Sequence, residues 1–294
     1  MFEITAVSED KKYADARIDA AIAEISRIEC LLTTFNENSQ TALINRNAGL
    51  EPVAVDKEVF DIIERSIKIS ELTQGAFDIT YGSIDKRFWN FDVHMTELPS
   101  AELAKKAVRL INYRNILLDK ENCTVFLKEA GMRIGFGGIG KGYAAERAKY
   151  VMRHMGLESG VVNASGDLTA WGLQPGGQPW TIGIADPNLK QQLFSYLNIT
   201  GLAIATSGNY EKYAVINGKK YSHTIDPKTG FPVSGIKSTT IICPNAEIAD
   251  AMATPVTVMG VDVGLDLINN MKDIACIIID DNDKLYTSKN IRIR

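Results

Sequence analysis

The sequence of 294 residues predicts an α+β protein in which helices pack on mixed or antiparallel sheets. Segments with a helical period occupy the first third of the chain and return near its end, whereas the centre is rich in short strand-like runs. Strands and helices do not alternate in the regular manner of a doubly wound parallel sheet. The content of 45% hydrophobic and 23% charged residues is typical of a globular protein. We expect either one domain over residues 1–294 or two interleaved subdomains within it.

We predict three helices before residue 111, and apolar side chains recur on one face of the first and of the second. Asp56 and Ser100 are suitable N-caps for the second and third helices, and Gly75 is a suitable end for the second. A strand precedes the helices, and a polar loop follows the first of them. The expected ranges are 2–7 for the strand, 11–32, 56–75 and 100–110 for the helices, and 36–40 for the loop.

Strands dominate the remainder of the chain. A Gly-rich turn leads into a helix over 141–155, and two further helices are expected at 246–259 and 262–271. Asn217-Gly218 is a strong signal for a two-residue hairpin turn. The expected strands are 115–119, 123–127, 132–136, 160–163, 168–171, 180–185, 194–199, 202–205, 212–216, 219–224, 237–242 and 274–280, with a last strand pair after Asp281.

Charge and composition argue against several functional classes. The chain has 32 Lys and Arg against 36 Asp and Glu, a net charge of −4, and no basic block, which argues against a nucleic-acid-binding protein. Three His and four Cys are few for a zinc or iron–sulfur centre, so a bound metal is expected to have oxygen ligands. No apolar run is long enough to span a membrane, and the acidic N-terminal residues differ from a signal peptide. Buried free thiols are expected at Cys30, Cys123, Cys243 and Cys276.

Residues 135–142, Gly-Phe-Gly-Gly-Ile-Gly-Lys-Gly, formally match two nucleotide-binding motifs. The dinucleotide motif G-x-G-x-x-G is present, but no acidic strand end follows about 20 residues later. The P-loop motif requires Ser or Thr where Gly142 stands. The turn still brings backbone N–H groups and Lys141 to a helix N-terminus, which suits a phosphate. The alternative is a tight turn packed under a sheet.

Two further positions have polar side chains suited to chemistry. Asp250 and Thr254 are four residues apart on one helical face among small residues, and together they can ligate a hard cation such as Mg²⁺. Alternatively, Asp250 faces the helix dipole and the Thr254 hydroxyl bonds to its own helix. His223 stands at a strand end before an Asp-Pro turn, where it can act as a general base or as an ordinary hydrogen-bonding residue. His94 and His154 lack such neighbours and are expected to be structural.

Taken in order, these segments and four others resemble one family, the ApbE flavin transferases, which are FAD:protein FMN transferases. The most specific pair is His-x-x-Asp-Pro-x-Thr-Gly from His223 and Ala-Asp-Ala-x-x-Thr ending at Thr254. The resemblance covers nearly the whole chain. The matching segments are Leu31-Leu-Thr-Thr-Phe-Asn-Glu-Asn-Ser, Gly75-Ala-Phe-Asp-Ile-Thr, Gly137-Gly-Ile-Gly-Lys-Gly-Tyr-Ala, Asn163-Ala-Ser-Gly-Asp, Ala205-Thr-Ser-Gly-Asn-Tyr, Ser222-His-Thr-Ile-Asp-Pro-Lys-Thr-Gly and Ala249-Asp-Ala-Met-Ala-Thr.

The resemblance implies a T-fold-like ApbE domain with FAD in a central cleft and Mg²⁺ on the FAD pyrophosphate. The implied reaction is Mg-dependent transfer of FMN from FAD to a Thr or Ser hydroxyl of an acceptor flavoprotein, which forms a phosphoester and releases AMP. Two alternatives remain open. One is a Mg-dependent FAD pyrophosphatase that yields FMN and AMP, and the other is a flavin-binding or storage protein.

The resemblance also implies roles for individual residues. Asp250, Thr254 and the backbone carbonyl of Gly138 correspond to ligands of Mg²⁺, and Lys141 corresponds to a contact with the FAD phosphates. His223 corresponds to the base that deprotonates the acceptor hydroxyl. The remaining implied contacts with FAD are Phe35, Ala76, Phe77, Asp78 and Ile225.

The chain departs from the family pattern at two places. Gly135 stands where the family usually has an Asp that contacts FAD, and a Met-Gly-Thr-like segment that normally precedes the first strand is missing. Family members are commonly exported to the outer face of the cytoplasmic membrane, in the periplasm. The resemblance therefore implies export with a signal segment trimmed from the chain as given, and the alternative is a cytoplasmic protein.

Overall fold

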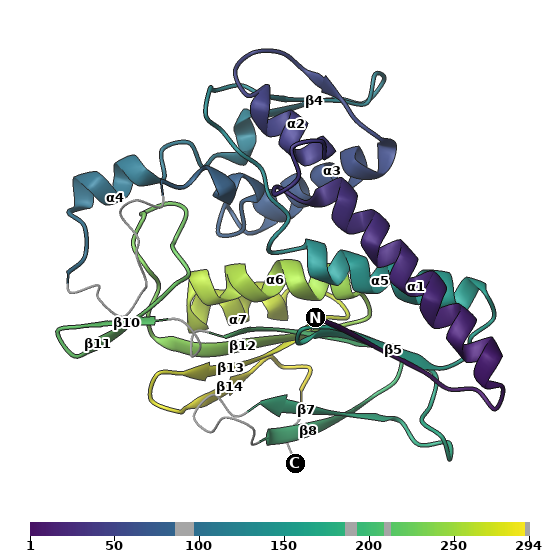
Figure 1. Ribbon diagram of the computed structural model, residues 1–294. Coiled ribbons are helices and arrows are strands. Elements are labelled where there is room, and N and C mark those ends of the chain that lie inside the picture. The colour runs from purple at the N-terminus through teal and green to yellow at the C-terminus, as the bar shows by residue number, and fades with distance from the viewer. Residues whose placement is uncertain (86–96, 186–192, 209–212, 292–294) are drawn as a thin grey trace. The chain divides into compact units, whose positions relative to one another are not determined.

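The computed structural model describes residues 1–85, 97–185, 193–208 and 213–291 (Figure 1). The chain divides into two compact units, which are described separately. The first comprises Met1–Ile28, Ile139–Tyr210 and Gly235–Arg294, and the second comprises Glu29–Gly138 and Glu211–Ser234. All strand pairs among the described residues are antiparallel, and helices accompany the sheets. The expected α+β class is therefore confirmed.

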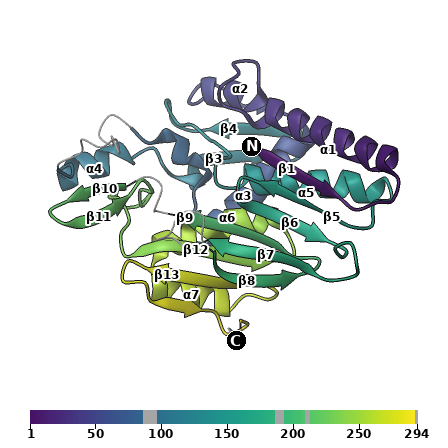
Figure 2. The ribbon, with the colours of Figure 1, turned by 60° about the horizontal axis from the view of Figure 1, so that its bottom comes forward.

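The first unit is built on a seven-stranded sheet within its described residues, with the order β1-β5-β6-β9-β12-β13-β14 (Figure 2). The N-terminal strand lies beside a strand from the middle of the chain, and Phe2 pairs with Ala164. The strands are β1 Phe2–Ala6, β5 Gly160–Ala164, β6 Asp167–Trp171, β9 Ala203–Gly208, β12 Ile236–Cys243, β13 Ala275–Asp280 and β14 Leu285–Thr287.

The two faces of this sheet are covered differently. Helices α5 (Gly140–His154), α6 (Ala246–Met259) and α7 (Val261–Asn269) lie on one face (Figure 1). The other face packs against the hairpin of β7 (Trp180–Ala185) and β8 (Leu193–Ile199). The apolar cluster on this side includes Leu168, Ile199, Ile204, Ile242 and Ile277. Because side chains on both faces of the sheet are buried, this unit has one core layer on each side of the sheet.

The second unit contains short helices, a small sheet and a separate hairpin. Helix α1 (Lys11–Leu32) begins in the first unit and ends in the second. The small sheet has the order β2-β4-β3, and β10 pairs with β11. The other elements are α2 Gln40–Arg46, α3 Lys57–Leu72, α4 Ala101–Ala107, the 3₁₀ turns Ile79–Ser83 and Tyr113–Asn115, and the strands β2 Val53–Ala54, β3 Ile116–Asp119, β4 Thr124–Leu127, β10 Tyr213–Ile216 and β11 Lys219–Ser222.

Most of the expected helices are present, with small differences at their ends. Ser100 caps α4 by accepting a hydrogen bond from the Leu103 N–H at 3.3 Å. Asp56 occupies the N-cap position of α3, but its side chain accepts a hydrogen bond from Gln40 instead of capping the helix. Among the described residues, no helix combines the length and apolar character needed to cross a membrane.

The predicted strand at 132–136 is wrong, because a side chain replaces the partner strand. The Ile134 N–H donates to Asn45 Oδ1 at 2.7 Å, and the Ile134 carbonyl accepts from Asn45 Nδ2 at 3.0 Å. This exchange of two hydrogen bonds satisfies the extended backbone without a ladder.

The prediction of four buried thiols is partly wrong. All four cysteines are free, but only Cys243 and Cys276 are buried. Cys30 is exposed on α1, whose outer face meets solvent, and Cys123 is half-buried in the turn between β3 and β4. Apolar neighbours in the sequence did not determine burial here, because one side of a surface helix faces water.

Candidate functional site

In the first unit, Asp250 of α6 closes the N-terminus of α5. Its Oδ2 accepts the Gly142 N–H at 2.9 Å, and the backbone N–H of Lys141 also donates to this carboxylate. Asp250 is buried, and burial, followed by the nearby charge of Asp167, raises its pKa to about 7. The backbone donors that the Gly-rich turn was expected to offer to a phosphate therefore already bind a carboxylate of the protein.

Gly142 is required by the close approach of α5 and α6. A Cβ atom at this position would lie 2.1 Å from the carbonyl oxygen of Ala246 and 2.8 Å from the Cβ of Asp250. No side chain fits there, which explains why glycine stands where a P-loop has Ser or Thr. The close packing at this point is therefore between α5 and α6, whereas a Cβ at Gly135 or Gly137 in the preceding turn would meet no atom within 4 Å.

Asp167 joins this site, although the sequence analysis assigned it no role. It is the first residue of β6, it is 3% exposed, and its carboxylate forms an ion pair with Lys141 Nζ. The backbone N–H of Thr206 on β9 donates to the same carboxylate. Burial raises the pKa of Asp167 above its ordinary value, although the charge of Lys141 opposes this effect. Its position in the Asn163-Ala-Ser-Gly-Asp segment was the only sequence signal that could have identified it.

Lys141 is therefore a cation facing two carboxylates. Burial works to lower its pKa, but the charges of Asp167 and Asp250 raise the pKa of Lys141 overall. Lys141 thus keeps its positive charge at neutral pH. A cation held in this way can neutralise a phosphate oxygen.

The donors on α6 suit Mg²⁺. Thr254 lies one turn after Asp250, and its hydroxyl makes no hydrogen bond to any other described residue. The threonine that bonds to its own helix is Thr257, whose hydroxyl donates to the Ala253 carbonyl at 3.0 Å. The described residues contain no group of three or more His, Cys, Asp or Glu side chains suited to a metal. One carboxylate and one hydroxyl, completed by phosphate oxygens of a substrate, form a typical Mg²⁺ donor set.

Gly138 ends a segment of the second unit and directly precedes Ile139, the N-cap of α5. The role of its carbonyl as a third ligand stays a prediction. A Cβ at Gly138 would lie 3.5 Å from the ring of Phe77, so this glycine packs beside one of the residues implied to contact FAD.

His223 lies in the second unit, in the turn that follows β11. The side chain is exposed. The turn is ordered by local hydrogen bonds, since the Thr224 N–H donates to Ser222 Oγ at 2.9 Å and the Lys228 N–H donates to Asp226 Oδ1 at 2.8 Å. An exposed imidazole on such a turn is accessible to a macromolecular substrate.

Asp78 uses its carboxylate within the protein. It accepts the Thr80 N–H at 2.8 Å, the Thr80 hydroxyl at 2.6 Å and the Tyr113 N–H at 2.9 Å. Burial raises the pKa of Asp78. This carboxylate caps the 3₁₀ turn that follows it and ties it to the Tyr113–Asn115 turn.

The other residues implied to contact FAD differ widely in exposure. Phe35 is 99% exposed, so its ring can receive a flat ligand. Ala76 and Phe77 are buried beside Asp78, and Ile225 is buried in a cluster with Ile84, Ala104 and Val108. A Cβ at Gly135 would meet no atom within 4 Å, so the missing Asp leaves open space. His94 and part of the Ala205–Tyr210 segment lie outside the described residues.

Comparison with known proteins places these features in a family. The ApbE family matches residues 1–278. An FAD:protein FMN transferase of Klebsiella pneumoniae is 32% identical over 272 residues, which is 92% of this chain and 84% of that protein. An FAD:protein FMN transferase of Treponema pallidum is 28% identical over 94% of this chain and 81% of that protein.

The fold of this chain is also similar to that of a solved ApbE protein. A crystal structure of the ApbE protein from Thermotoga maritima superposes with a TM-score of 0.86 and 31% identity, covering 98% of this chain and 93% of that one. This agreement confirms the ApbE-like architecture that the sequence motifs implied. The sequence match, the fold and the order of the motifs together establish that the chain belongs to the ApbE family.

Proposed function

We propose that this protein transfers FMN from FAD to a Thr or Ser hydroxyl of an acceptor protein, in a Mg-dependent reaction that forms a phosphoester and releases AMP. The observation that carries the proposal is the placement of Lys141 beside Asp250 at the N-terminus of α5, with the Thr254 hydroxyl one turn further on. The names of the relatives, FAD:protein FMN transferase, support the same reaction.

The first unit acts on the FAD phosphates. Lys141 neutralises a phosphate oxygen, and Asp167 holds its ammonium group in place. Asp250 and Thr254 would hold Mg²⁺, and the family resemblance implies the carbonyl of Gly138, the last residue of a second-unit segment, as a further ligand. When bound, Mg²⁺ supplies Lewis-acid stabilisation of the charge that develops on the pyrophosphate.

The second unit acts on the acceptor. His223 takes the proton of the acceptor hydroxyl, which is a poor nucleophile until a base removes that proton. The hydroxyl oxygen forms a bond to the FMN phosphorus, the bond to the AMP phosphate breaks, and the electron pair leaves with AMP. The expected FAD contacts in this unit are Phe35, Ala76, Phe77, Asp78 and Ile225.

The test is incubation of the protein with FAD, Mg²⁺ and a candidate acceptor, followed by mass spectrometry of the acceptor and quantification of AMP. We expect one FMN per modified Thr or Ser and an equal amount of AMP. His223→Ala should lower the transfer rate by about 10²–10⁴-fold while FAD binding, followed by flavin fluorescence, persists. Chelation of Mg²⁺ should stop the reaction.

Three results would contradict the proposal in whole or in part. Release of free FMN and AMP with no modified acceptor would indicate a pyrophosphatase. Retention of FAD with no turnover under any condition would indicate a flavin-binding protein. An unchanged rate in His223→Ala would show that another group is the base.

A further inference from the structure

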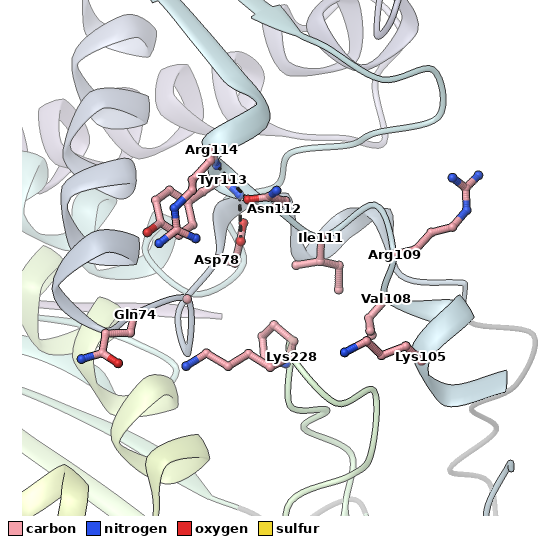
Figure 3. Close-up of a pocket in the computed structure, with 12 residues that line it drawn as sticks. Gln74, Asp78, Lys105, Val108, Arg109, Ile111, Asn112, Tyr113, Arg114 and Lys228 are labelled. Atoms are coloured by element: carbon pink, nitrogen blue, oxygen red, sulfur yellow. Dashed lines mark hydrogen bonds between the residues drawn. The ribbon is translucent and has the colours of Figure 1, made fainter. Parts of the chain in front are cut away.

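A cationic pocket of about 530 Å³ lies in the second unit (Figure 3). Three of its four cationic side chains come from α4 and the segment after it, namely Lys105, Arg109 and Arg114, and the fourth is Lys228 from the turn after His223. The chain carries a net charge of −4, so a grouping of four cations around one concave surface is a local feature.

The positive charge of this pocket has little compensation. Among the residues that the structure describes, Asp78 is the only carboxylate that lines the pocket, and it already accepts three hydrogen bonds within the protein. Lys105, Arg109 and Lys228 form no ion pair with any residue that the structure describes. Figure 3 shows the Lys105 side chain extending from α4 toward the Lys228 turn and the Lys228 side chain extending toward Gln74, whereas Arg109 points away from both.

Arg114 adds a planar cation to the wall. Its guanidinium lies 4.6 Å from the centre of the Tyr113 ring, so one of its faces is occupied by stacking. The N–H groups at the edge of a stacked guanidinium remain able to bind a carboxylate. The pocket therefore presents ammonium and guanidinium donors suited to an anion.

The pocket is linked to the proposed base through a short, ordered turn. Lys228 follows His223 by five residues, a chain length that spans at most about 18 Å. Asp226 folds the turn around Lys228, since the Gly230 N–H donates to the Asp226 carbonyl at 2.9 Å and the Thr229 hydroxyl donates to Asp226 Oδ2 at 2.9 Å. An extended peptide rises about 3.3 Å per residue. Consider an acceptor peptide whose reacting hydroxyl lies at His223. A side chain about six residues or fewer from that hydroxyl along the peptide can therefore reach this pocket.

We infer that this pocket binds an acidic segment of the acceptor protein, with Asp or Glu side chains within about six residues of the modified Thr or Ser. The inference rests on the proposed function, which supplies the acceptor. Carboxylates complement the ammonium groups of Lys105 and Lys228, and this complementarity selects the acceptor and its register. The competing occupant is a phosphate of FAD itself, and Lys141 in the first unit already provides a cation for that group.

The test uses fluorescein-labelled peptides, each with one central Thr and two Asp at spacings of about two to six residues on either side, a range taken from the reach of the chain. Matched peptides carry Asn in place of Asp. Binding is followed by fluorescence anisotropy, and versions with Ala in place of Thr bind without being modified. FAD affinity and flavinylation of the Thr peptides are measured separately.

The decisive variant is the double substitution Lys105→Gln and Lys228→Gln. Its matched control is Lys106→Gln with Lys128→Gln, which removes the same charge from exposed side chains of the same unit that do not line the pocket. Lys105 and Lys106 are neighbours on α4, so the comparison tests position and not net charge.

We expect the acidic peptide to bind at least about tenfold more tightly than its Asn version, and only the Lys105/Lys228 variant to lose this difference. Added salt should weaken the binding of the acidic peptide to the unmodified protein. Equal binding by the two double variants would overturn the inference. So would a loss of FAD affinity confined to the Lys105/Lys228 variant, which would assign the pocket to the nucleotide.

The failure of the proposed function is separable from these outcomes. If acidic peptides bind in a Lys105- and Lys228-dependent manner but none is flavinylated, the pocket assignment stands and the transferase proposal fails. If peptides are flavinylated equally by all variants, the transferase proposal stands and the pocket assignment fails.

Discussion

At the scale of single residues, Asp167 holds Lys141, the residue proposed to contact the FAD phosphates. The two side chains form an ion pair across 26 residues of sequence, and the carboxylate is almost fully buried while half of the lysine side chain remains accessible. A free lysine side chain loses considerable rotamer entropy when it binds. A lysine already held by a buried carboxylate has lost part of that entropy before FAD arrives, so Asp167 is a positioning residue for the proposed reaction.

Replacement of Asp167 by Asn should separate binding from catalysis. The change removes a negative charge near the proposed phosphate site, and this favours FAD binding. It also releases Lys141, so the lysine ammonium group is less well aligned with the FAD phosphates. We expect kcat to fall about tenfold while the KM for FAD changes by less than about threefold. Lys141→Ala should instead raise the KM for FAD. Steady-state kinetics with varied FAD distinguish these patterns, and Asp167→Glu, which retains the charge, should recover part of the loss. Normal kcat in Asp167→Asn would contradict the positioning role.

The raised pKa of Asp250 predicts that Mg²⁺ binding at the proposed site depends on pH. Its pKa is raised to about 7 in the folded chain, well above the ordinary value near 3.8. The folded state therefore holds this proton more tightly than the unfolded state, so the associated stability is full below about pH 4 and is lost as the pH rises through 7. Mg²⁺ binds the charged carboxylate, so its stabilising effect should grow over the same range.

Thermal unfolding with Mg²⁺ or with a chelator, at about pH 6 and about pH 8, checks this expectation. The rise in Tm caused by Mg²⁺ should be larger at the higher pH. In the Asp250→Asn variant, the rise in Tm caused by Mg²⁺ should be small at both pH values, because the neutral amide is a weaker Mg²⁺ ligand than the carboxylate. A Mg²⁺ effect of equal size at both pH values in the unmodified protein would show that Asp250 does not control metal binding.

At the scale of elements, the contact between α5 and α6 brings together the residues of the proposed phosphate site. The helices approach so closely at Gly142 that the backbone N–H reaches the Asp250 carboxylate. Small residues on α6, including Ala246, Ala249 and Ala253, permit this approach and are buried. The absence of a side chain at Gly142 therefore has a functional consequence, since a greater helix separation would break the hydrogen bond to a proposed metal ligand.

Gly142→Ala should consequently destabilise the protein by about 2–4 kcal/mol or prevent folding, because the added Cβ overlaps the Ala246 carbonyl. Gly137→Ala is the matched control within the same turn, since a Cβ there meets no atom within 4 Å and its φ is not positive. We expect the control to change stability by less than about 1 kcal/mol. Urea unfolding measures both, and equal stability of the two variants would contradict the packing argument.

The elements also show which local patterns predict structure. Helices α1, α3 and α5 followed from apolar periodicity, and α4 from its Ser100 cap, because these signals lie within the segment itself. The extended segment around Ile134 has the same strand-like composition as true strands, but its hydrogen bonds go to Asn45, which is 89 residues distant in sequence. No local pattern could reveal that partner.

At the scale of the whole molecule, the two units carry different parts of the proposed chemistry. The first unit holds Lys141, Asp167, Asp250 and Thr254, which are proposed to act on phosphates, and the second holds the His223 turn and the cationic pocket. The first unit depends on a sheet in which strands from the N-terminus, the middle and the C-terminal part of the chain are neighbours. Strand order of this kind arises from packing of complete faces, so it was not predictable from the pattern of each strand.

The sequence by itself determined the positions of most helices and strands and the motifs around Lys141, His223 and Asp250 that resemble the ApbE family. These properties depend on residues close together in the chain, where helical period, turn chemistry and short motifs operate. Only the tertiary structure decided that Asp250 closes the N-terminus of α5 across 108 residues, that Asp167 holds Lys141, and that Lys228 joins the cations after α4 in one pocket. Such contacts leave no local signal in the sequence, because burial and charge pairing depend on how close two residues are in space and not on how close they are along the chain.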